Sequence, residues 1–429
     1  MKKIKQGLVP KLRFREFEKD GEWEEKKLGE ICGYSNGLSH ENSVTEKGDY
    51  YLISLNSIDI NGKLKPDMKR LSNTDNSLQK DDLIMVLSDV AHGNFLGLVD
   101  IIPNDRFVLN QRMARLRIKE SDLADVRFLR TFINSNQKYF KANGQGSSQL
   151  NLSKSSVTDF AVLFPLISEQ QKIADCLSSL DELIEAEDQK LEALQRHKKG
   201  LMQELFPADG ETLPRLRFPE FQSAPEWEEK PFSNFIKLYR GSSPRPIQEF
   251  LTKNNDGVNW IKIGDTKFSS NFIIGKVEEK ITKKGAERSR FVEIGELILA
   301  NSMSYGKTYQ LAINGCIYDG WFVLREYEDF FYKPFLLQLL NSDFMQKQYE
   351  SLSAGGIVQN ISSEVVYSSK LFHTSIPEQA RIADFLTSVD DLITSQTKKL
   401  ESLRLHKKGL MQQLFPNHNQ EEITNHNKP

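Results

Sequence analysis

Two stretches of the chain carry apolar residues at the spacing of a long amphipathic helix. The first has polar breaks at Glu187 and Lys198, and its apolar positions are Ile173, Leu177, Leu180, Ile184, Leu191, Leu194, Leu201 and Leu205. The second keeps the same register, with breaks at Gln396 and Lys407, at Ile382, Leu386, Val389, Ile393, Leu400, Leu403, Leu410 and Leu414. Steps of three, four and seven residues are typical of a heptad seam. Pro207 and Pro416 end two predicted helices of about 37 residues, each roughly 55 Å long.

A helix of this length has no small domain in which to bury its whole apolar stripe. The two matching seams most simply pack against each other, although the sequence also allows each helix to pack on its own globular domain. A duplicated unit folded on itself tends toward two-fold symmetry, and a two-fold axis across the helices would make the pair antiparallel. The seams alone do not exclude a parallel pair.

The segments before these helices alternate between strand-like and helix-like patterns. Residues 82–87 and 97–102 read as buried strands, and residues 112–118 alternate between apolar and polar positions. Residues 126–142 read as one helix, with residues 335–352 as its counterpart in the second half. Polar, glycine-containing loops follow these helices at residues 144–149 and 354–359. The pattern predicts two mixed α and β domains.

The chain is one unit written twice. Leu12-Arg13-Phe14 recurs at 216–218, and the Glu-Trp-Glu-Glu-Lys of residues 22–26 recurs at 226–230. Residues 169–207 and 378–416 share 24 identities in 39 positions. Between them, residues 40–165 and 245–372 match only at scattered points, such as residues 82–84 with 296–298, and just before these ranges Gly37 matches Gly241. Near-identical ends indicate two copies of one structural or docking task, and divergent middles indicate two different ligands.

Composition excludes several classes of protein and favours none. The 429 residues are 38% hydrophobic and 27% charged, with a net charge of −2 and a pI near 6.4, so no overall basic character announces a nucleic-acid binder. Cys32, Cys176 and Cys316 stand far apart without metal-ligand spacing. We see no targeting signal and no apolar run of membrane-spanning length, so we expect a cytoplasmic protein.

Signatures of catalysis are also missing from the sequence. Residues 301–308 end like a phosphate-binding loop, but Asn301 replaces its first glycine. There is no Pro-Pro pair of the kind found in adenine methyltransferase motifs, and the seven histidines show no metal-binding spacing. His197 and His406 fall in the last turns of the long helices, where a cation suits the helix dipole. We therefore expect a non-catalytic chain without a metal site.

Over residues 9–416 the pattern resembles the specificity (S) subunits, or HsdS family, of type I restriction–modification systems. The resemblance rests on the Leu-Arg-Phe-x-x-Phe and Trp-Glu-x-Lys segments, on the Glu-Gln-x-x-Ile-Ala-Asp helix starts, and on His-Lys-Lys-Gly-Leu-Met-Gln ending in Leu-Phe-Pro. It implies target recognition domains at 1–166 and 208–374, and long spacer helices at 167–207 and 375–416 that form an antiparallel coiled coil. A polar tail would occupy 417–429.

The resemblance also implies a function and partners. Each recognition domain would read one half of an asymmetric bipartite site on double-stranded DNA, and the helices would set the spacer between the halves. Two DNA adenine methyltransferase (modification) subunits and ATP-dependent restriction subunits would join the chain. S-adenosylmethionine, Mg²⁺ and ATP would be bound by those partners, and this chain would carry no cofactor. A coiled-coil adaptor that binds two proteins without DNA, or an enzyme with an unfamiliar site, are the competing interpretations.

Candidate DNA-binding residues lie in polar loops, because amides and hydroxyls suit base edges and nearby cations suit phosphates. In the first half they are Ser39, His40, Asn56, Ser88, His92, Asn94, Arg112, Gln145, Ser147 and Gln149. In the second half they are Arg240, Ser242, Arg245, Lys262, Ser302, Ser304, Tyr305, Lys307, Gln359 and Asn360. Candidate partner-docking residues are Trp23, Trp227, His197, Lys198, Gly200, His406, Lys407 and Gly409. Ordinary surface loops, and for the two glycines simple tolerance near a helix end, are the alternative explanations.

Overall fold

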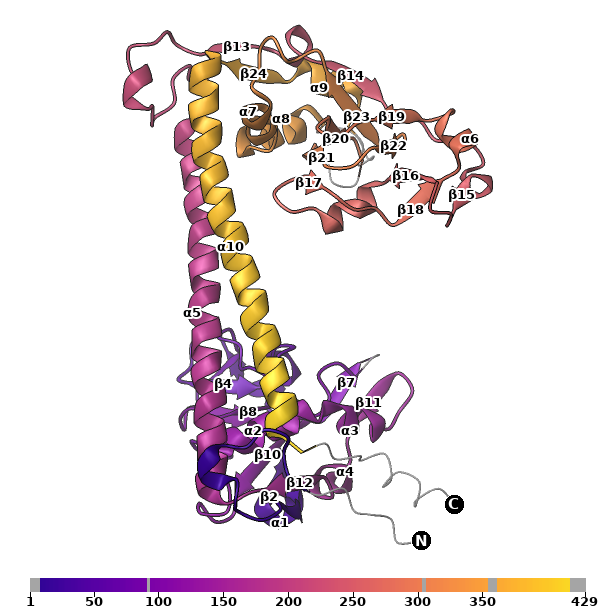
Figure 1. The fold of residues 1–429 in the computed structure, drawn as a ribbon. Coiled ribbons are helices and arrows are strands. Elements are labelled where there is room, and N and C mark those ends of the chain that lie inside the picture. Colours follow the sequence, from indigo (N-terminus) through magenta and orange to yellow (C-terminus); the bar gives the residue numbers. More distant parts are fainter. Residues whose placement is uncertain (1–7, 91–92, 303–305, 354–360, 417–429) are drawn as a thin grey trace. The chain divides into compact units, whose positions relative to one another are not determined.

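The computed structural model of the chain describes residues 8–90, 93–302, 306–353 and 361–416. The chain forms two compact units (Figure 1): the first unit comprises residues 1–186 and 401–429, and the second comprises residues 187–400. Each unit holds one sheet-rich domain and parts of two long helices, α5 (Ile167–Leu205) and α10 (Ile376–Leu414). The predicted fold class, two mixed α/β domains joined by two long helices, is confirmed.

The first unit is built on a four-stranded antiparallel sheet in the order β2–β10–β6–β8. Both faces of this sheet are covered, because Ala114 and Leu116 of β10 join one buried apolar cluster and Met113 joins another. This double burial explains why the strands read as nearly continuous apolar runs. The strands are β2 (Cys32–Asn36), β6 (Leu83–Val86), β8 (Val99–Ile101) and β10 (Met113–Ile118).

A second sheet of this unit has the order β3–β5–β4–β9, and its strands β4 and β9 run parallel, with Leu52 opposite Val108. Its strands are β3 (Val44–Thr45), β4 (Tyr50–Ile53), β5 (Arg70–Leu71) and β9 (Phe107–Leu109). Two antiparallel pairs complete the unit: β1 (Glu24–Lys27) with β12 (Ala161–Phe164), and β7 (Ser88–Val90) with β11 (Gln149–Asn151). Its short helices are α1 (Leu28–Ile31), α2 (Val126–Ser135), α3 (Gln137–Ala142) and α4 (Lys154–Thr158).

The second unit repeats this plan with two five-stranded sheets. The first, in the order β14–β23–β20–β21–β17, has strands β14 (Lys237–Arg240), β17 (Ile273–Ile274), β20 (Leu297–Ala300), β21 (Thr308–Leu311) and β23 (Trp321–Arg325). The other, in the order β15–β18–β16–β22–β19, has strands β15 (Leu251–Thr252), β16 (Val258–Ile261), β18 (Glu279–Ile281), β19 (Arg290–Val292) and β22 (Gly315–Ile317). Strand β13 (Glu228–Pro231) pairs with β24 (Lys370–His373). The short helices are α6 (Lys283–Ala286), α7 (Lys333–Leu340), α8 (Asp343–Ser353) and α9 (Ser363–Ser368).

The helix predicted over residues 126–142 is wrong in one respect, because the structure breaks it into α2 and α3 at Asn136. The side-chain amide of Asn136 donates a hydrogen bond to the backbone carbonyl of Phe132, four residues earlier, at 2.9 Å. The counterpart over residues 335–352 breaks in the same way at Asn341, whose amide donates to the carbonyl of Leu337 at 3.0 Å. An asparagine that bonds the preceding turn competes with the helical backbone pattern, so each helix ends there.

One matched glycine in each unit shows how closely the two folds correspond. The amide of Gly37 donates to the carbonyl of Met113 at 3.1 Å, and the amide of Gly241 donates to the carbonyl of Trp321 at 2.9 Å. A Cβ on Gly37 would lie 2.2 Å from the carbonyl oxygen of Asn110, and one on Gly241 would lie 2.0 Å from that of Tyr318. No side chain fits such an approach, which explains a glycine shared by otherwise divergent segments.

The two long helices run antiparallel. Within the first unit Asp181 of α5 pairs with Lys407 of α10 at 2.5 Å, and within the second unit Lys198 pairs with Asp390 at 2.7 Å. Because the partner's number falls as the number along α5 rises, the helices point in opposite directions. The polar breaks in the heptads are thus used as interhelix contacts.

Both ends of each long helix lie in an apolar core. Ile173, Ala174 and Leu177 of α5 belong to the core of the first unit, and Leu205 and Phe206 belong to the core of the second. The start of α10 lies in the core of the second unit through Ile382, Ala383 and Leu386, and its end lies in the core of the first through Leu414 and Phe415. In the described part of the chain, no helix combines the length and apolar character that crossing a membrane requires.

Candidate nucleic-acid interface

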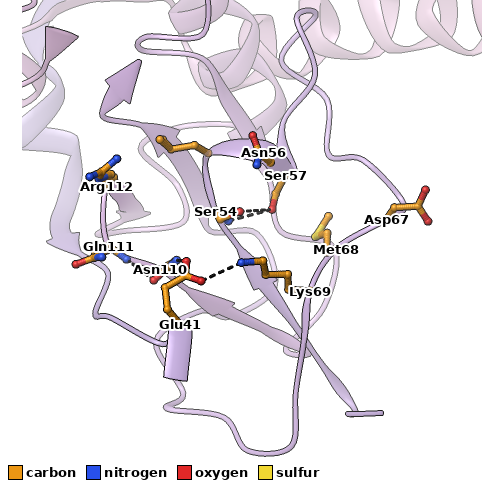
Figure 2. A pocket seen from close by; sticks show the side chains of 11 residues that line it. Glu41, Ser54, Asn56, Ser57, Asp67, Met68, Lys69, Asn110, Gln111 and Arg112 are labelled. Carbon is orange, nitrogen blue, oxygen red and sulfur yellow. Dashed lines mark hydrogen bonds and ion pairs between the residues drawn. The ribbon is translucent and has the colours of Figure 1, made fainter. Parts of the chain in front are cut away.

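In the first unit a polar cavity lies where two parallel strands end. Strands β4 and β9 are neighbours, so the loops that leave their carboxyl ends meet at one edge of the sheet, which is where ligands commonly bind in open sheets. The cavity there has a volume of about 460 Å³ (Figure 2). Its lining residues are Glu41, Ser54, Leu55, Asn56, Ser57, Asp67, Met68, Lys69, Asn110, Gln111 and Arg112.

Arg112 is the exposed cation of this edge. Its backbone φ is +70°, in the left-handed region that residues other than glycine rarely adopt, so its position is imposed by the fold around it. Within the described part of the chain no carboxylate pairs with its guanidinium, and its neighbour Gln111 is exposed as well. The arrangement leaves a free guanidinium beside an amide, and Asn56 on the adjacent loop adds a second exposed amide.

Asn110 connects the loops of this edge through hydrogen bonds of its side chain. Its side-chain oxygen accepts from the amides of Gln111 at 2.9 Å and His40 at 3.3 Å, and its amide group donates to Glu41 at 2.9 Å. Glu41 also pairs with Lys69 at 2.9 Å. The hydrogen bonds from Lys69 and then from Asn110 lower the pKa of Glu41, which keeps this carboxylate charged and neutralises Lys69. Among the described residues that line the cavity, Arg112 therefore carries the unpaired positive charge.

A second group of predicted residues gathers on the β7–β11 ribbon. The hydroxyl of Ser88 donates to Asn151 at 2.7 Å and accepts from the side chain of Gln149. Gln145 continues the ribbon through backbone bonds of 2.9 Å with Asn151 in both directions. Asn94 is exposed and lies against α3, where its backbone carbonyl accepts a hydrogen bond from the side chain of Gln137 at 2.6 Å. The ribbon joins the first group, because the amide of Leu87 donates to the carbonyl of Arg112 at 3.0 Å.

In the second unit the equivalent edge is centred on Asp319, after strand β22. Arg240 donates to the carbonyl of Asp319 at 3.1 Å, and the guanidinium of Arg245, 83% exposed, lies 3.7 Å from its carboxylate. The hydroxyl of Ser302 lies 3.5 Å from that of Tyr318, and Ser242 bonds the carbonyl of Arg288 at 3.5 Å. A hydrogen bond from Ser243 lowers the pKa of Asp319, so a carboxylate stands where the first unit has Gln111.

The two lysines predicted as DNA-binding residues in the second unit have different surroundings. Lys262 follows β16 at the same sheet edge and pairs with Glu279 at 2.6 Å. Lys307 is half-buried, and this burial lowers its pKa. Lys262 is therefore neutralised within the chain, while Lys307 is partly withdrawn from solvent.

The other predicted residues have varied outcomes. His92, Ser304, Tyr305, Gln359 and Asn360 lie outside the described residues. Ser39 and Ser147 are exposed, and His40 bonds Asp75 at 3.0 Å. Sequence reasoning missed Glu41, Lys69, Asn110 and Asp319, because only the parallel pairing of strands distant in sequence brings them to the edge.

The residues predicted to dock partners divide into buried and exposed ones. Trp23 and Trp227 are each 2% exposed, so their rings pack within this chain and are not available as contact surfaces. Lys198 and Lys407 are engaged in the interhelix ion pairs. His197 and His406 are exposed. Among the described residues, no heavy atom apart from those of the adjoining helical turn lies within 4 Å of a Cβ placed on Gly200 or Gly409.

The buried cysteines and the acidic and histidine side chains of the described residues bear on whether catalytic groups are assembled here. Burial raises the pKa of Cys32 to about 12 and that of Cys316 to about 11, so both thiols stay protonated and unreactive. Among the described residues, no group of three or more histidine, cysteine, aspartate or glutamate side chains is placed to hold a metal ion. Both edges instead present amides, hydroxyls and guanidinium groups.

Comparison with known proteins identifies this arrangement. Residues 20–196 match the family model described as the type I restriction modification DNA specificity domain. The type I restriction enzyme MjaVIII specificity subunit of Methanocaldococcus jannaschii is 23% identical over 405 residues, which cover 92% of each chain. The putative MjaX specificity subunit of the same organism is 24% identical over 281 residues, covering 65% of this chain and 63% of its own.

Two solved structures share the fold. The S subunit of a type I restriction–modification system from M. genitalium aligns with a TM-score of 0.59 at 16% identity, covering 96% of this chain and 100% of its own. A chain from a structure of type I R-M complex assembly and conformational transition aligns with a TM-score of 0.59 at 17% identity, covering 92% of this chain and 98% of its own.

The fold and the two sheet edges define a class of protein. Its members have two related domains joined by paired long helices, and each domain presents a polar sheet edge with its own set of side chains. The comparisons place it further: over most of its length the chain is similar to specificity subunits of type I restriction enzymes, and residues 20–196 match the type I restriction modification DNA specificity domain. Its relatives are named as specificity subunits, which confirms the prediction of a non-catalytic component.

Proposed function

We propose that this chain reads an asymmetric two-part DNA site, one half with each sheet-rich domain, and that the paired helices set the spacer between the halves. One observation supports this proposal. The two units follow the same backbone path at their sheet edges but present different side chains there. Where the first unit has Asn110, Gln111 and Arg112 after β9, the second has Tyr318, Asp319 and Gly320 after β22. Amides favour different base edges from a carboxylate and a phenol, whereas the guanidinium of Arg112 suits a phosphate, so two different half-sites are expected.

The electrostatics of the chain support a role inside a larger complex. A net charge of −2 leaves few free cations for phosphate contacts, so partners would supply much of the neutralisation. The partners are two DNA adenine methyltransferase subunits and, where present, ATP-dependent restriction subunits. These would bind S-adenosylmethionine, Mg²⁺ and ATP, each methyltransferase would flip out one adenine, and this chain would bind no cofactor.

The direct test is to co-express the chain with the methyltransferase gene beside it and to map methylated adenines by long-read sequencing. The expected result is an asymmetric two-part motif that disappears when this chain is omitted. Exchanging residues 40–165 for those of another specificity subunit should change one half of the motif and preserve the other. Absence of methylation with an active methyltransferase in a stable complex would favour the coiled-coil adaptor, and a change in both halves would refute the two-reader model.

A further inference from the structure

The second unit carries an additional strand beside its polar edge. Among the described residues of the first unit, the sheet β3–β5–β4–β9 ends at β9, whereas the matching order β15–β18–β16–β22 continues to a fifth strand, β19 (Figure 1). Strand β19 runs antiparallel to β22, with Arg290 opposite Ile317. Because β22 ends at Ile317 and Asp319 follows, the start of β19 lies at the edge that is centred on Asp319.

The start of this strand brings two arginines to the edge. Arg288 lies in the turn before β19, and its backbone carbonyl accepts a hydrogen bond from the hydroxyl of Ser242 at 3.5 Å. Arg290 is the first residue of β19, and its guanidinium donates to the backbone carbonyl of Arg240 at 3.0 Å. Both arginines therefore lie beside the segment that follows β14, although about 50 residues separate them from it in the sequence.

Aromatic rings support both guanidinium groups. The guanidinium carbon of Arg288 lies 5.4 Å from the ring centroid of Phe250, and that of Arg290 lies 5.6 Å from the ring centroid of Tyr239. A ring attracts a cation without cancelling its charge. Arg288 is exposed and Arg290 is half-buried, and in the described part of the chain no carboxylate forms an ion pair with either of them. Both positive charges therefore stay available to a ligand.

The first unit has an acidic loop in the same place. The amide of Leu109, the last residue of β9, donates to the hydroxyl of Ser77 at 3.1 Å, so the loop around Ser77 takes the position that β19 has beside β22. Two residues earlier in this loop, Asp75 bonds His40 at 3.0 Å. One edge is thus flanked by a carboxylate and the other by two guanidinium groups.

We infer that Arg288 and Arg290 bind phosphate groups of the DNA backbone beside the half-site read by the second unit, an inference that rests on the proposed function. A guanidinium presents several donors in a plane that matches the oxygens of a phosphate. Contacts of this kind position a protein on the duplex without reading its sequence. The additional strand therefore gives the second unit phosphate contacts that the acidic loop denies to the first.

The test measures how the affinity of the methyltransferase complex for a duplex carrying its methylated motif depends on salt, between about 50 and 200 mM. Arg288→Gln and Arg290→Gln should each lower the slope of log affinity against log salt concentration by about one unit, and the double variant by about two. Arg288→Lys and Arg290→Lys should keep the slope, because lysine retains the charge. Lys276→Gln is the matched control and should also keep it, since this exposed lysine follows β17, at the opposite edge of the sheet from β14.

Methylation mapping of the same variants separates the outcomes. A lower slope with both half-sites intact supports the inference. If the second half-site relaxes, in the lysine variants as well, the arginines read bases and the inference is overturned. If the glutamine variants keep the slope while the motif persists, the arginines contact no phosphate and the proposed function stands.

Two further results decide the remaining cases. If the unmodified complex yields no two-part motif, the proposed function fails, and this inference fails with it. Arg288 is exposed, so Arg288→Gln should melt at the temperature of the unmodified chain. That variant decides the test by itself if Arg290→Gln does not fold.

Discussion

At the scale of single residues, the duplicated motifs at the ends of each repeat act through buried contacts within this chain. Arg13 forms a two-pronged ion pair with Glu169, with distances of 2.8 and 2.6 Å, and Arg217 forms the same pair with Glu378, at 2.7 and 2.9 Å. Both pairs are almost fully buried. The adjoining glutamines bond backbone groups of the preceding loops, with Gln170 donating to Pro165 at 3.0 Å. The Leu-Arg-Phe and Glu-Gln motifs of each repeat therefore bind each other through this buried arginine–glutamate pair, which we call the clamp.

Glu378→Gln should destabilise the second unit by about 3–5 kcal/mol, because a buried Arg217 would lose its charged partner. Burial alone would raise the pKa of Glu378, but the bonds from Arg217, Thr374 and Trp227 outweigh it and hold this pKa below its ordinary value of 4.5. A depressed folded-state pKa adds stability that is fully present above 4.5 and is lost as pH falls through the lower value. The difference in unfolding free energy between wild type and variant, measured by denaturant titration, should therefore shrink in acid.

The control for this experiment is Asp256→Asn, which breaks an ion pair with Lys283 whose side chains are 71% and 74% exposed. Exposed pairs contribute at most about 1 kcal/mol, so this variant should unfold almost as wild type does. Equal destabilisation by the two variants, or a Glu378→Gln difference that persists in acid, would contradict the clamp.

Arg112→Asn should weaken DNA binding by the complex and leave its sequence preference intact, because Arg112 is expected to contact a phosphate. Asparagine tolerates the left-handed backbone at this position, so the change removes the cation without forcing the turn. The slope of log affinity against log salt concentration should fall by about one unit. The matched control is Arg106→Asn, an exposed arginine before the opposite end of β9. An unchanged slope would place Arg112 outside the interface.

At the scale of elements, the ends of the long helices complete the cores of the domains. Phe415 packs against Trp23, Phe128 and Phe132, with ring centroids 6.3, 5.6 and 5.6 Å apart. Phe206 occupies the matching place beside Trp227 and Phe335, at 6.3 and 5.5 Å. The Leu-Phe-Pro motif therefore fills a core instead of merely ending a helix, and the duplicated tryptophan is its packing partner.

Phe415→Ala should destabilise the first unit by about 3–5 kcal/mol, through lost burial and the cavity left behind. Hydrogen exchange measured by mass spectrometry should show faster exchange in β2, β6 and β10 and little change in the second unit. Phe206→Ala should give the reverse pattern. Leu405→Ala, at a position of α10 that is 70% exposed, should change neither unit. Uniform loss of protection by Phe415→Ala would mean that the two units unfold together.

At the scale of the whole molecule, both helices connect the same two cores through the same number of residues. Ile173 and Leu205 lie 32 residues apart on α5, and Ile382 and Leu414 lie 32 residues apart on α10. Because each helix is held at both ends, neither length can change alone without moving an anchor out of its core. Between the anchors, Gln396 donates to Glu187 at 2.6 Å, a polar contact of the kind that fixes register in coiled coils.

Removing one heptad from both helices should shorten the spacer of the methylated motif by about three base pairs, since seven residues span roughly 10.5 Å of helix and one base pair spans about 3.4 Å. Both half-sites should stay as they are. Methylation mapping of the co-expressed complex measures both. Removing the heptad from α5 alone should instead destabilise the protein, because the apolar residues at the ends of the two helices could no longer all pack in their cores. An unchanged spacer in the double deletion would rule out the helices as its determinant.

Much of the architecture follows from the sequence by itself. Heptad spacing predicts both long helices, and the repeat predicts two related domains with different surfaces. These features depend on residues close together in the chain, or on comparison of the chain with itself. The repeat also located Gly37 and Gly241, although only the structure shows the carbonyl contact that requires them.

Tertiary structure alone decided the roles of particular side chains. Trp23 is a core residue because Phe415, from the other end of the chain, packs against it. Among the described residues that line the cavity, Arg112 is left as the unpaired cation because Glu41, 28 residues before Lys69, neutralises that lysine. Such partners are chosen by strand pairing and helix docking, which join segments whose separation in sequence carries no pattern. The sequence therefore determined the framework and its duplication, and the packing of distant segments determined which residues face a ligand.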